Sequence, residues 1–214
     1  MNDDKNIQHL FKVRRTVLQM IRDRGYVVFD SKDDLNISRS SFEEFYMKNH
    51  AICRKSLEIK RPRWDNPENR ILIVFVEGEK DKMNIGVKSI RLFCERIKNE
   101  GFSRVLMILN GKLTPHAKQA VSSINSNNDL IEYFSENELI VNITHHMLVP
   151  KHEILSKNES KSLLERYSIK FDHLPKILKN DPVAKYLGLQ RSEIVKITRV
   201  SETSGKFITY RICI

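Results

Sequence analysis

Two uninterrupted apolar runs constrain the fold of this chain more than any other feature. They are "ILIVFV" at residues 71–76 and "VLMIL" at residues 105–109. Such runs are typical of β-strands that are covered on both faces, as in parallel sheets. The segment between them predicts a helix that ends at Gly101, because its apolar residues recur at helical spacing. These residues are Ile90, Phe93, Cys94 and Ile97.

The same alternation continues toward residue 143. A helix is predicted within "TPHAKQAVSSI" (114–124), followed by short strands at "LIEYF" (130–134) and "LIVNI" (139–143). Residues 70–143 then read strand, helix, strand, helix, strand, which is typical of a parallel sheet. We therefore predict an α/β N-terminal domain with a mainly parallel sheet flanked by helices.

Two more helices are predicted before the first of these strands. Residues 5–24 carry apolar side chains at helical spacing, and Gly25 is suited to end the helix. Arg14 lies inside this apolar stripe, so we expect it to pair with a carboxylate or to reach the solvent. The second helix is predicted within "SRSSFEEFYMKNHAICRKS" (38–56), capped by one of its serines, with Glu43 or Glu44 able to complete the cap.

The last part of the chain has a different pattern. A strand is predicted in "VPKHEIL" (149–155) and a capped helix in "SKNESKSLLERY" (156–167). Asp181, Pro182 and Gly188 then predict a short helix over 182–187 that buries Val183, Ala184 and Leu187. We predict a small α+β C-terminal domain, with domain boundaries of 1–143 and 144–214.

The chain is predicted to end in a β-hairpin. "EIVKITRV" (193–200) and "KFITYRICI" (206–214) are rich in β-branched and aromatic residues, and "SETSG" between them supplies a turn. Side chains of a strand alternate between its two faces. In the second strand one face carries Ile208, Tyr210, Ile212 and Ile214, and the other carries Phe207, Thr209, Arg211 and Cys213.

Charge points to an acidic partner. The chain has a formal net charge of +10, and residues 144–214 carry 13 Lys and Arg against 7 Asp and Glu. A basic chain gains affinity for a polyanion through counterion release, and it can equally dock on an acidic protein. We expect no membrane contact and an intracellular, soluble protein, because no apolar run approaches the ~20 residues of a membrane span and "MNDDKNIQHL" does not resemble a signal peptide.

The chain shows little sign of catalysis or of a cofactor. Glycine-loop, G-x-S-x-G and H-E-x-x-H motifs are missing from the sequence, and its three cysteines are isolated, so we expect no metal and no cofactor. "LEIK" (57–60) leaves one alternative, because Glu58 and Lys60 on a strand could serve a magnesium-dependent nuclease. We expect instead a solvated strand face. His145, His146 and His152 are expected to be surface histidines rather than metal ligands.

"NGKLTPHAK" (110–118) is the better candidate for a binding site. Thr114 is predicted to cap a helix whose first residue is Pro115, directly after a buried strand. The positive end of that helix, together with Lys112 and Lys118, would attract an anion. The alternative is an ordinary capped helix with solvated lysines.

The C-terminal sequence resembles a known family. "DPVAKYLGLQRSEIVKITRVSETSGKFITYR" and "HHMLVPKHEILSKNES" are similar to the end of the fifth subunit of eukaryotic RNA polymerases, which polymerases I, II and III share. The same module resembles a small archaeal RNA polymerase subunit that consists of little else. Looser matches run through "KVRRTVLQMIRDRGY", "GVKSIRLFCERI" and "LTPHAKQAV". The resemblance covers nearly the whole chain and is weakest over residues 28–80.

The resemblance implies a non-catalytic subunit of a nuclear DNA-directed RNA polymerase. An N-terminal jaw would contact downstream double-stranded DNA, and a C-terminal assembly module would dock on the largest catalytic subunit. The expected DNA-contact residues are Lys112, Thr114, Pro115, His116 and Lys118. For the subunit interface we expect Arg199, Glu202, Ile208, Tyr210 and Arg211.

Three departures from the family pattern are visible. Val200 stands where the family carries proline, which frees a backbone N–H beside the hairpin turn. His116 replaces a serine of the family pattern, and the segment 54–70 has no counterpart that we can align.

Two alternative functions remain: a nuclease centred on Glu58 and Lys60, and a free-standing basic DNA-binding protein. Co-purification with large polymerase chains would separate them from a polymerase subunit.

Overall fold

The computed structural model describes residues 2–31, 34–48, 51–78, 84–125 and 131–214. The chain divides into two compact units, Met1–Val141 and Asn142–Ile214. Within the described part of the chain, no helix has both the length and the apolar character that a bilayer span requires.

The first unit is built on a four-stranded sheet in the order β3-β4-β6-β8. Strands β4, β6 and β8 run parallel, while the edge strand β3 is antiparallel to β4. Their bounds are Ile59–Pro62 for β3, Arg70–Val76 for β4, Arg104–Leu109 for β6 and Ile131–Ser135 for β8. The prediction of an α/β domain with a mainly parallel sheet is confirmed.

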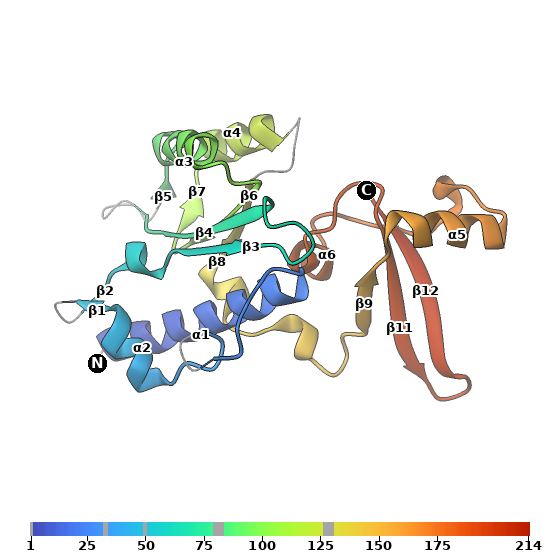
Figure 1. Ribbon diagram of the computed structural model, residues 1–214, viewed down its shortest axis with the longest axis horizontal. Helices are drawn as coiled ribbons and strands as arrows, with labels where there is room; N and C mark the ends of the chain where they lie inside the picture. Colours follow the sequence, from blue (N-terminus) through green and yellow to red (C-terminus); the bar gives the residue numbers. More distant parts are fainter. Residues whose placement is uncertain (1, 32–33, 49–50, 79–83, 126–130) are drawn as a thin grey trace. The chain divides into compact units, whose positions relative to one another are not determined.

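Helices cover both faces of this sheet, as the two apolar runs require (Figure 1). Helices α3 (Val87–Glu100) and α4 (Pro115–Asn125) lie on one face, and α1 (Asn2–Asp23) and α2 (Arg39–Tyr46) lie on the other. Leu72, Val74 and Val76 of β4 pack in one core cluster with residues of α3 and α4. The alternate residues of β4 are buried as well, so the whole run is enclosed: Ile71, Ile73 and Phe75.

Arg14 of α1 is buried, and its guanidinium is surrounded by polar partners. Its guanidinium donates to the backbone oxygen of Asp34 (3.2 Å) and to the Tyr46 hydroxyl (3.0 Å), and it lies 3.8 Å from an Asp34 carboxylate oxygen. The pairing expected for Arg14 is thus confirmed, as a buried cation requires. The helix ends before Gly25, whose φ of +84° suits glycine.

The second predicted helix lies at the start of the stretch 38–56. Ser38 caps it by accepting from the Ser41 amide, but α2 ends at Tyr46. Met47 takes an extended conformation, and β1 (Met47–Lys48) pairs antiparallel with β2 (Ala51–Ile52). A 3₁₀ turn η1 (Arg54–Leu57) follows. The prediction of a serine-capped helix within residues 38–56 is confirmed, and the helix covers only the first part of that stretch; residues 49–50 lie outside the described residues.

The strand predicted at "LIVNI" was also wrong. Leu139 ends the 3₁₀ turn η2 (Glu136–Leu139), and Ile143 begins another, η3 (Ile143–His145). Two polar anchors favour turns here. Glu136 forms a buried ion pair with Arg54, and Asn142 caps η3 by accepting from the Thr144 amide. Burial in this cluster also lowers the pKa of His9, whose Nε2 lies 3.4 Å from Glu136.

The second unit contains a four-stranded sheet in the order β10-β12-β11-β9. Strands β11 (Ile194–Ser201) and β12 (Gly205–Cys213) form the predicted hairpin, with β9 (Lys151–Ile154) on one side and β10 (Lys176–Ile177) on the other. Three short elements complete the unit: α5 (Lys157–Tyr167), the 3₁₀ turn η4 (Phe171–His173) and α6 (Pro182–Leu187). The predicted α+β fold with a C-terminal hairpin is confirmed.

The caps of both helices follow from the sequence. Ser156 and Glu159 form a reciprocal cap at the start of α5. Asp181 accepts from the first amides of α6, and Gly188 ends that helix with a φ of +70°. Ala184 is buried as predicted, but Tyr186 is buried in place of Val183, because its hydroxyl accepts from Asn142.

Each face of the second sheet packs on its own small core. One core lies between the sheet and α6, together with Leu189 just after that helix, and contains Val195, Ile197 and Cys213. The other core lies against α5 and contains Ile194, Ile212 and Tyr210. The predicted alternation of β12 is therefore real, and both faces are covered at the inner end of the hairpin. Two cores within one unit give it a basis for independent folding.

We predict that residues 142–214 fold without the rest of the chain. A fragment that starts at 144 instead should lose the Asn142–Tyr186 hydrogen bond (3.0 Å), and should be about 1 kcal/mol less stable toward urea. Dispersed amide resonances from the longer fragment would support the prediction. A collapsed, undispersed spectrum would contradict it.

Candidate functional site

The predicted anion-binding turn follows the central strand β6 directly. After β6, Lys112 and Leu113 form β7, which pairs in parallel with β5 (Asn84–Ile85). The Thr114 amide then donates to the Ile85 oxygen (3.3 Å), and α4 begins at the next residue. Backbone pairing thus fixes the place where α4 starts.

Thr114 caps α4 as the sequence predicts. Its side-chain oxygen accepts from the Ala117 amide (3.2 Å), and its backbone oxygen accepts from the Lys118 amide (3.0 Å). Ala117 is fully buried and holds the first turn of the helix against the core. The structure thus brings all five predicted DNA-contact residues onto one turn, with Lys112, Pro115, His116 and Lys118 exposed and Thr114 half-buried.

The charge of this turn is not neutralised locally. Among the described residues, neither Lys112 nor Lys118 lies within ion-pair distance of a carboxylate. The first amides of a helix also carry partial positive charge. We call residues 112–118 the α4 turn. It presents a compact positive surface that could bind a phosphate group. The same geometry also occurs in ordinary capped helices that bind no ligand.

The hairpin is the second candidate site, because it extends beyond the cores that cover its inner end. Val200 of β11 is 94% exposed, while Phe207 and Ile208 of β12 are 53% and 45% exposed. The sequence analysis missed Val200 and Phe207. Their exposure could have been anticipated only by knowing how far α5 and α6 reach along the strands.

The predicted interface residues do not form one patch. Cross-strand register places Ile208 and Tyr210 on the α5 side of the sheet, whereas Arg199 and Arg211 lie on the α6 side. Glu202 lies in the exposed turn between the strands. Tyr210 packs in the α5 core, and its ring centroid lies 6.5 Å from that of Tyr167. Tyr210 therefore has a structural role, whatever it contacts outside the chain.

The cations of the hairpin differ in how they are paired. Near the inner end, Glu153 of β9 lies 2.5 Å from Lys151 and 3.8 Å from Lys196. The hydrogen bond from Lys151 lowers the pKa of the Glu153 carboxyl. Among the described residues, no carboxylate lies within ion-pair distance of Arg211, which is opposite Val195 at the inner end, or of Arg199 and Lys206 further out. The outer half of the hairpin is therefore both apolar and positively charged.

Comparisons with known proteins decide the family. A model described as "RNA polymerase Rpb5, N-terminal domain" matches residues 4–97, and one described as "RNA polymerase Rpb5, C-terminal domain" matches residues 141–213. The chain is 38% identical over 211 residues to "DNA-directed RNA polymerases I, II, and III subunit rpabc1" of Dictyostelium discoideum, covering 98% of this chain and 100% of that protein. The chain belongs to the RNA polymerase Rpb5 family.

A nematode relative gives the same result. The RPABC1 subunit of RNA polymerases I, II and III from Caenorhabditis elegans is 37% identical over 216 residues, covering 100% of this chain and 99% of that protein. The resemblance stated from the sequence is thus confirmed. The chain is a non-catalytic subunit of a DNA-directed RNA polymerase. Membership of the Rpb5 family removes the reason to regard Glu58 and Lys60 as a nuclease centre.

The structure gives Glu58 another role. Its two carboxylate oxygens accept from the two terminal nitrogens of Arg96 at 2.6 and 2.7 Å, in bidentate geometry. Arg96 also donates to Glu100 at 2.5 Å, and Lys60 donates to Glu100 at 2.6 Å. We call Glu58, Lys60, Arg96 and Glu100 the ion network. It links the edge of the sheet to α3.

The expectation of a solvated strand face holds for Lys60, which is exposed, but not for Glu58. Glu58 lies just before β3, and its side chain is only 18% exposed because Arg96 covers it. The hydrogen bonds that Arg96 donates to Glu58 and, second, to Glu100 raise the pKa of Arg96. Hydrogen bonds from Lys60 and then Arg96 lower the pKa of the Glu100 carboxyl. Every charged group of the network is satisfied within the protein.

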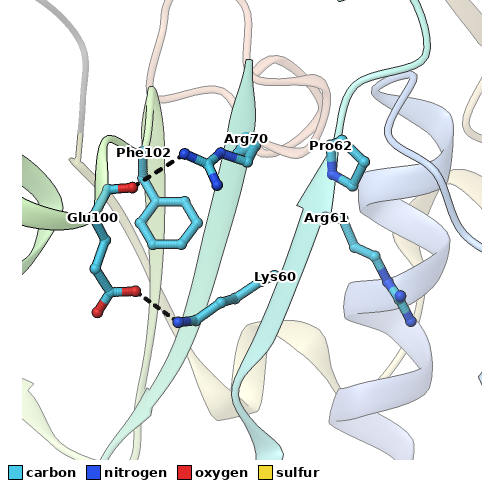
Figure 2. Close-up of a pocket in the computed structure, with 6 residues that line it drawn as sticks. All are labelled: Lys60, Arg61, Pro62, Arg70, Glu100 and Phe102. Atoms are coloured by element: carbon cyan, nitrogen blue, oxygen red, sulfur yellow. Dashed lines mark hydrogen bonds and ion pairs between the residues drawn. The ribbon is translucent and has the colours of Figure 1, made fainter. Parts of the chain in front are cut away.

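An open pocket lies beside this network (Figure 2). Its lining includes Lys60, Arg70 and Phe102, and Figure 2 shows Lys60 and Arg70 both reaching toward Glu100. Arg70 donates to the backbone oxygen of Glu100 (3.2 Å), and both cations lie over the Phe102 ring, at 5.4 and 5.5 Å from its centroid. The cations of the pocket already have partners, so the pocket is not a free anion site.

The three predicted surface histidines do not gather into a metal site. His146 accepts from the Leu148 amide (3.2 Å), and His152 shares a hydrogen bond with the Pro150 oxygen (2.7 Å). No group of three His, Cys, Asp or Glu side chains suited to a metal occurs among the described residues.

We predict that the ion network stabilises the first unit. Glu58→Ala should lower the free energy of unfolding by about 1–2 kcal/mol, because it removes two charge-assisted hydrogen bonds from a partly buried guanidinium. Urea unfolding of this variant, of Arg96→Met and of the double variant measures the coupling. The effect of the double variant should be smaller than the sum of the two single effects. Strict additivity would show that the pair contributes nothing jointly.

Proposed function

We propose that this chain is the subunit common to nuclear RNA polymerases I, II and III. In this role the second unit docks on the largest catalytic subunit, and the first unit contacts the downstream double-stranded DNA. The names of the relatives, which assign them to all three polymerases, support the first statement. The nucleus is the expected compartment. Docking and DNA contact rest on separate surfaces.

Docking is supported above all by the exposure of the hairpin. Apolar side chains left in water at the end of a strand pair favour burial against a partner. Val200, Phe207 and Ile208 supply the apolar area, and Arg199 and Arg211 supply positive charge that would favour an acidic partner surface. In such interfaces a few buried anchors provide most of the affinity, while surrounding charges fix orientation.

Val200 gives the sharpest test of docking. Val200→Asp leaves the fold intact because the side chain is 94% exposed, yet it should lower the affinity for the largest subunit at least about tenfold if the residue is buried there. The matched control is Val200→Thr, which keeps the branched shape and adds no charge. Quantitative pull-down with the largest subunit measures both.

The expected order of recovery is wild type, then Val200→Thr, then Val200→Asp. Equal thermal unfolding temperatures for the three proteins would show that the difference arises at the interface. Equal recovery of all three would contradict docking through the outer hairpin. A chain that never co-purifies with large polymerase subunits would contradict the proposed function as a whole.

DNA contact is supported by the α4 turn. Its two lysines lack carboxylate partners among the described residues, and a helix start lies between them. Phosphates are recognised by such helix ends and cations without regard to base sequence. The turn is small, so it would contribute a few contacts to a DNA duplex that other subunits hold.

We predict that Lys112→Glu combined with Lys118→Glu weakens downstream DNA contact in the assembled polymerase. Two lost phosphate contacts should reduce the salt slope of binding by about two units. Footprinting of the downstream edge at several salt concentrations measures this. The matched control is Lys5→Glu with Lys55→Glu, which makes the same charge change at exposed positions outside the α4 turn.

Subunit composition should be normal in both double variants. The α4-turn variant alone should lose protection at the downstream edge, for any DNA sequence. If both variants reduce protection equally, the effect comes from net charge and not from the turn. Unchanged protection in the α4-turn variant would contradict the proposed DNA contact and leave an ordinary capped helix.

A further inference from the structure

Strand β12 is paired along its whole length on one side only. On that side β11 contacts every residue from Gly205 to Ile212. On the other side β10 pairs only with Ile212 and Cys213. Within the part of the chain that the structure describes, the stretch 205–211 therefore has an open backbone edge. This edge belongs to the same outer half of the hairpin whose side chains are exposed.

The direction of the backbone groups can be read from the inner end of β12. The Ile212 amide donates to Pro175 (2.9 Å), on the β10 side, whereas the Cys213 amide donates to Glu193 (2.9 Å), on the β11 side. In an antiparallel strand both polar groups of a residue point to the same side, and successive residues alternate. The N–H and C=O groups of Ile208 and Tyr210 must therefore point to the open edge.

An edge of this kind is rarely left uncovered. Unpaired strand edges recruit other strands, and proteins usually protect them with charge, bulges or a covering segment. Here the edge carries apolar side chains, since Phe207 is 53% and Ile208 is 45% exposed. Among the described residues, only two residues of β10 cover this edge. The uncovered length is enough for a strand of about five residues.

We propose that an extended segment of the polymerase subunit on which this unit docks adds to the open edge of β12 as a further strand. Its backbone hydrogen-bonds to the N–H and C=O groups of Ile208 and Tyr210, as in other cases of strand addition. This inference rests on the docking proposed above and specifies how the docking occurs.

The faces of the hairpin indicate the chemistry of the added strand. On the α5 side its side chains would lie beside Ile208 and Tyr210 of β12, so they are apolar. On the α6 side they would meet Phe207 and Arg211, so they include an acidic residue. Arg199 on the same side adds to the positive charge there, and neither arginine has a carboxylate partner among the described residues. A strand that alternates apolar and acidic residues fits both faces.

Amide hydrogen exchange tests the strand addition directly. The labelled full chain is exchanged free and inside the assembled polymerase, and then read residue by residue after dissociation. Ile208 and Tyr210 should exchange fast in the free chain and about 100-fold more slowly in the polymerase, because they become hydrogen-bonded only there. Phe207 and Thr209 face β11 and serve as internal controls that are slow in both states.

The outcomes separate this inference from the docking itself. If the chain co-assembles but Ile208 and Tyr210 exchange equally fast in both states, the strand addition is wrong and docking stands. If the chain does not co-assemble with the polymerase, the docking proposal is wrong, and the strand addition that rests on it is wrong as well.

A substitution gives an independent test. Ile208→Pro removes the outward N–H and none of the bonds to β11, whereas Ile208→Ala removes the side chain and keeps the N–H. The proline variant should bind the partner subunit about tenfold more weakly than the alanine variant. Equal affinity would overturn the proposal. Should the proline variant fail to fold, the exchange experiment on the wild-type chain still decides.

Discussion

The pairing of β11 with β12 extends beyond the hydrophobic cores that cover it, and the proposed docking depends on this difference. At the inner end, Ile194 and Val195 pack on opposite cores, so both faces of the hairpin are fixed. At the outer end the ladder continues to the Ser201–Gly205 pair, while Val200 stays in solvent. A rigid inner end therefore presents an apolar, basic outer end in a defined conformation. Preorganisation of this kind lowers the entropic cost of binding.

The first unit likewise holds an exposed segment, the α4 turn, in a defined conformation. Its central sheet is enclosed on both faces, and the parallel pairing of β5 with β7 holds the start of α4 at the end of β6. The ion network links the edge of the sheet to α3, and the buried Arg54–Glu136 pair joins η1 to η2. Several charged residues in the described part of this unit are thus paired internally. Lys112 and Lys118 are exposed cations with no carboxylate of the described residues close enough to pair with either.

Local signals predicted much of this structure, and long-range contacts account for what was missed. Apolar runs identified β4 and β6, and Thr114, Asp181 and Gly188 marked helix ends, because each of these effects acts within a few residues. Glu58 was misinterpreted because its partner Arg96 lies 38 residues away in the sequence. The segment 139–143 was misinterpreted for the same reason, since Glu136 meets Arg54 only in the folded chain. The five residues of the α4 turn were predicted together, whereas those of the hairpin were assigned to one interface without regard to their two faces.

A structure of the assembled polymerase containing this chain would test the central claim most directly. The quantity to measure is the exposed fraction of the Val200 side chain, which is 94% in the chain alone. We expect Val200 to be buried against the largest subunit, with Phe207 and Ile208 beside it in the same contact. A polymerase in which the second unit is bound while Val200 remains fully exposed would contradict docking through the outer hairpin.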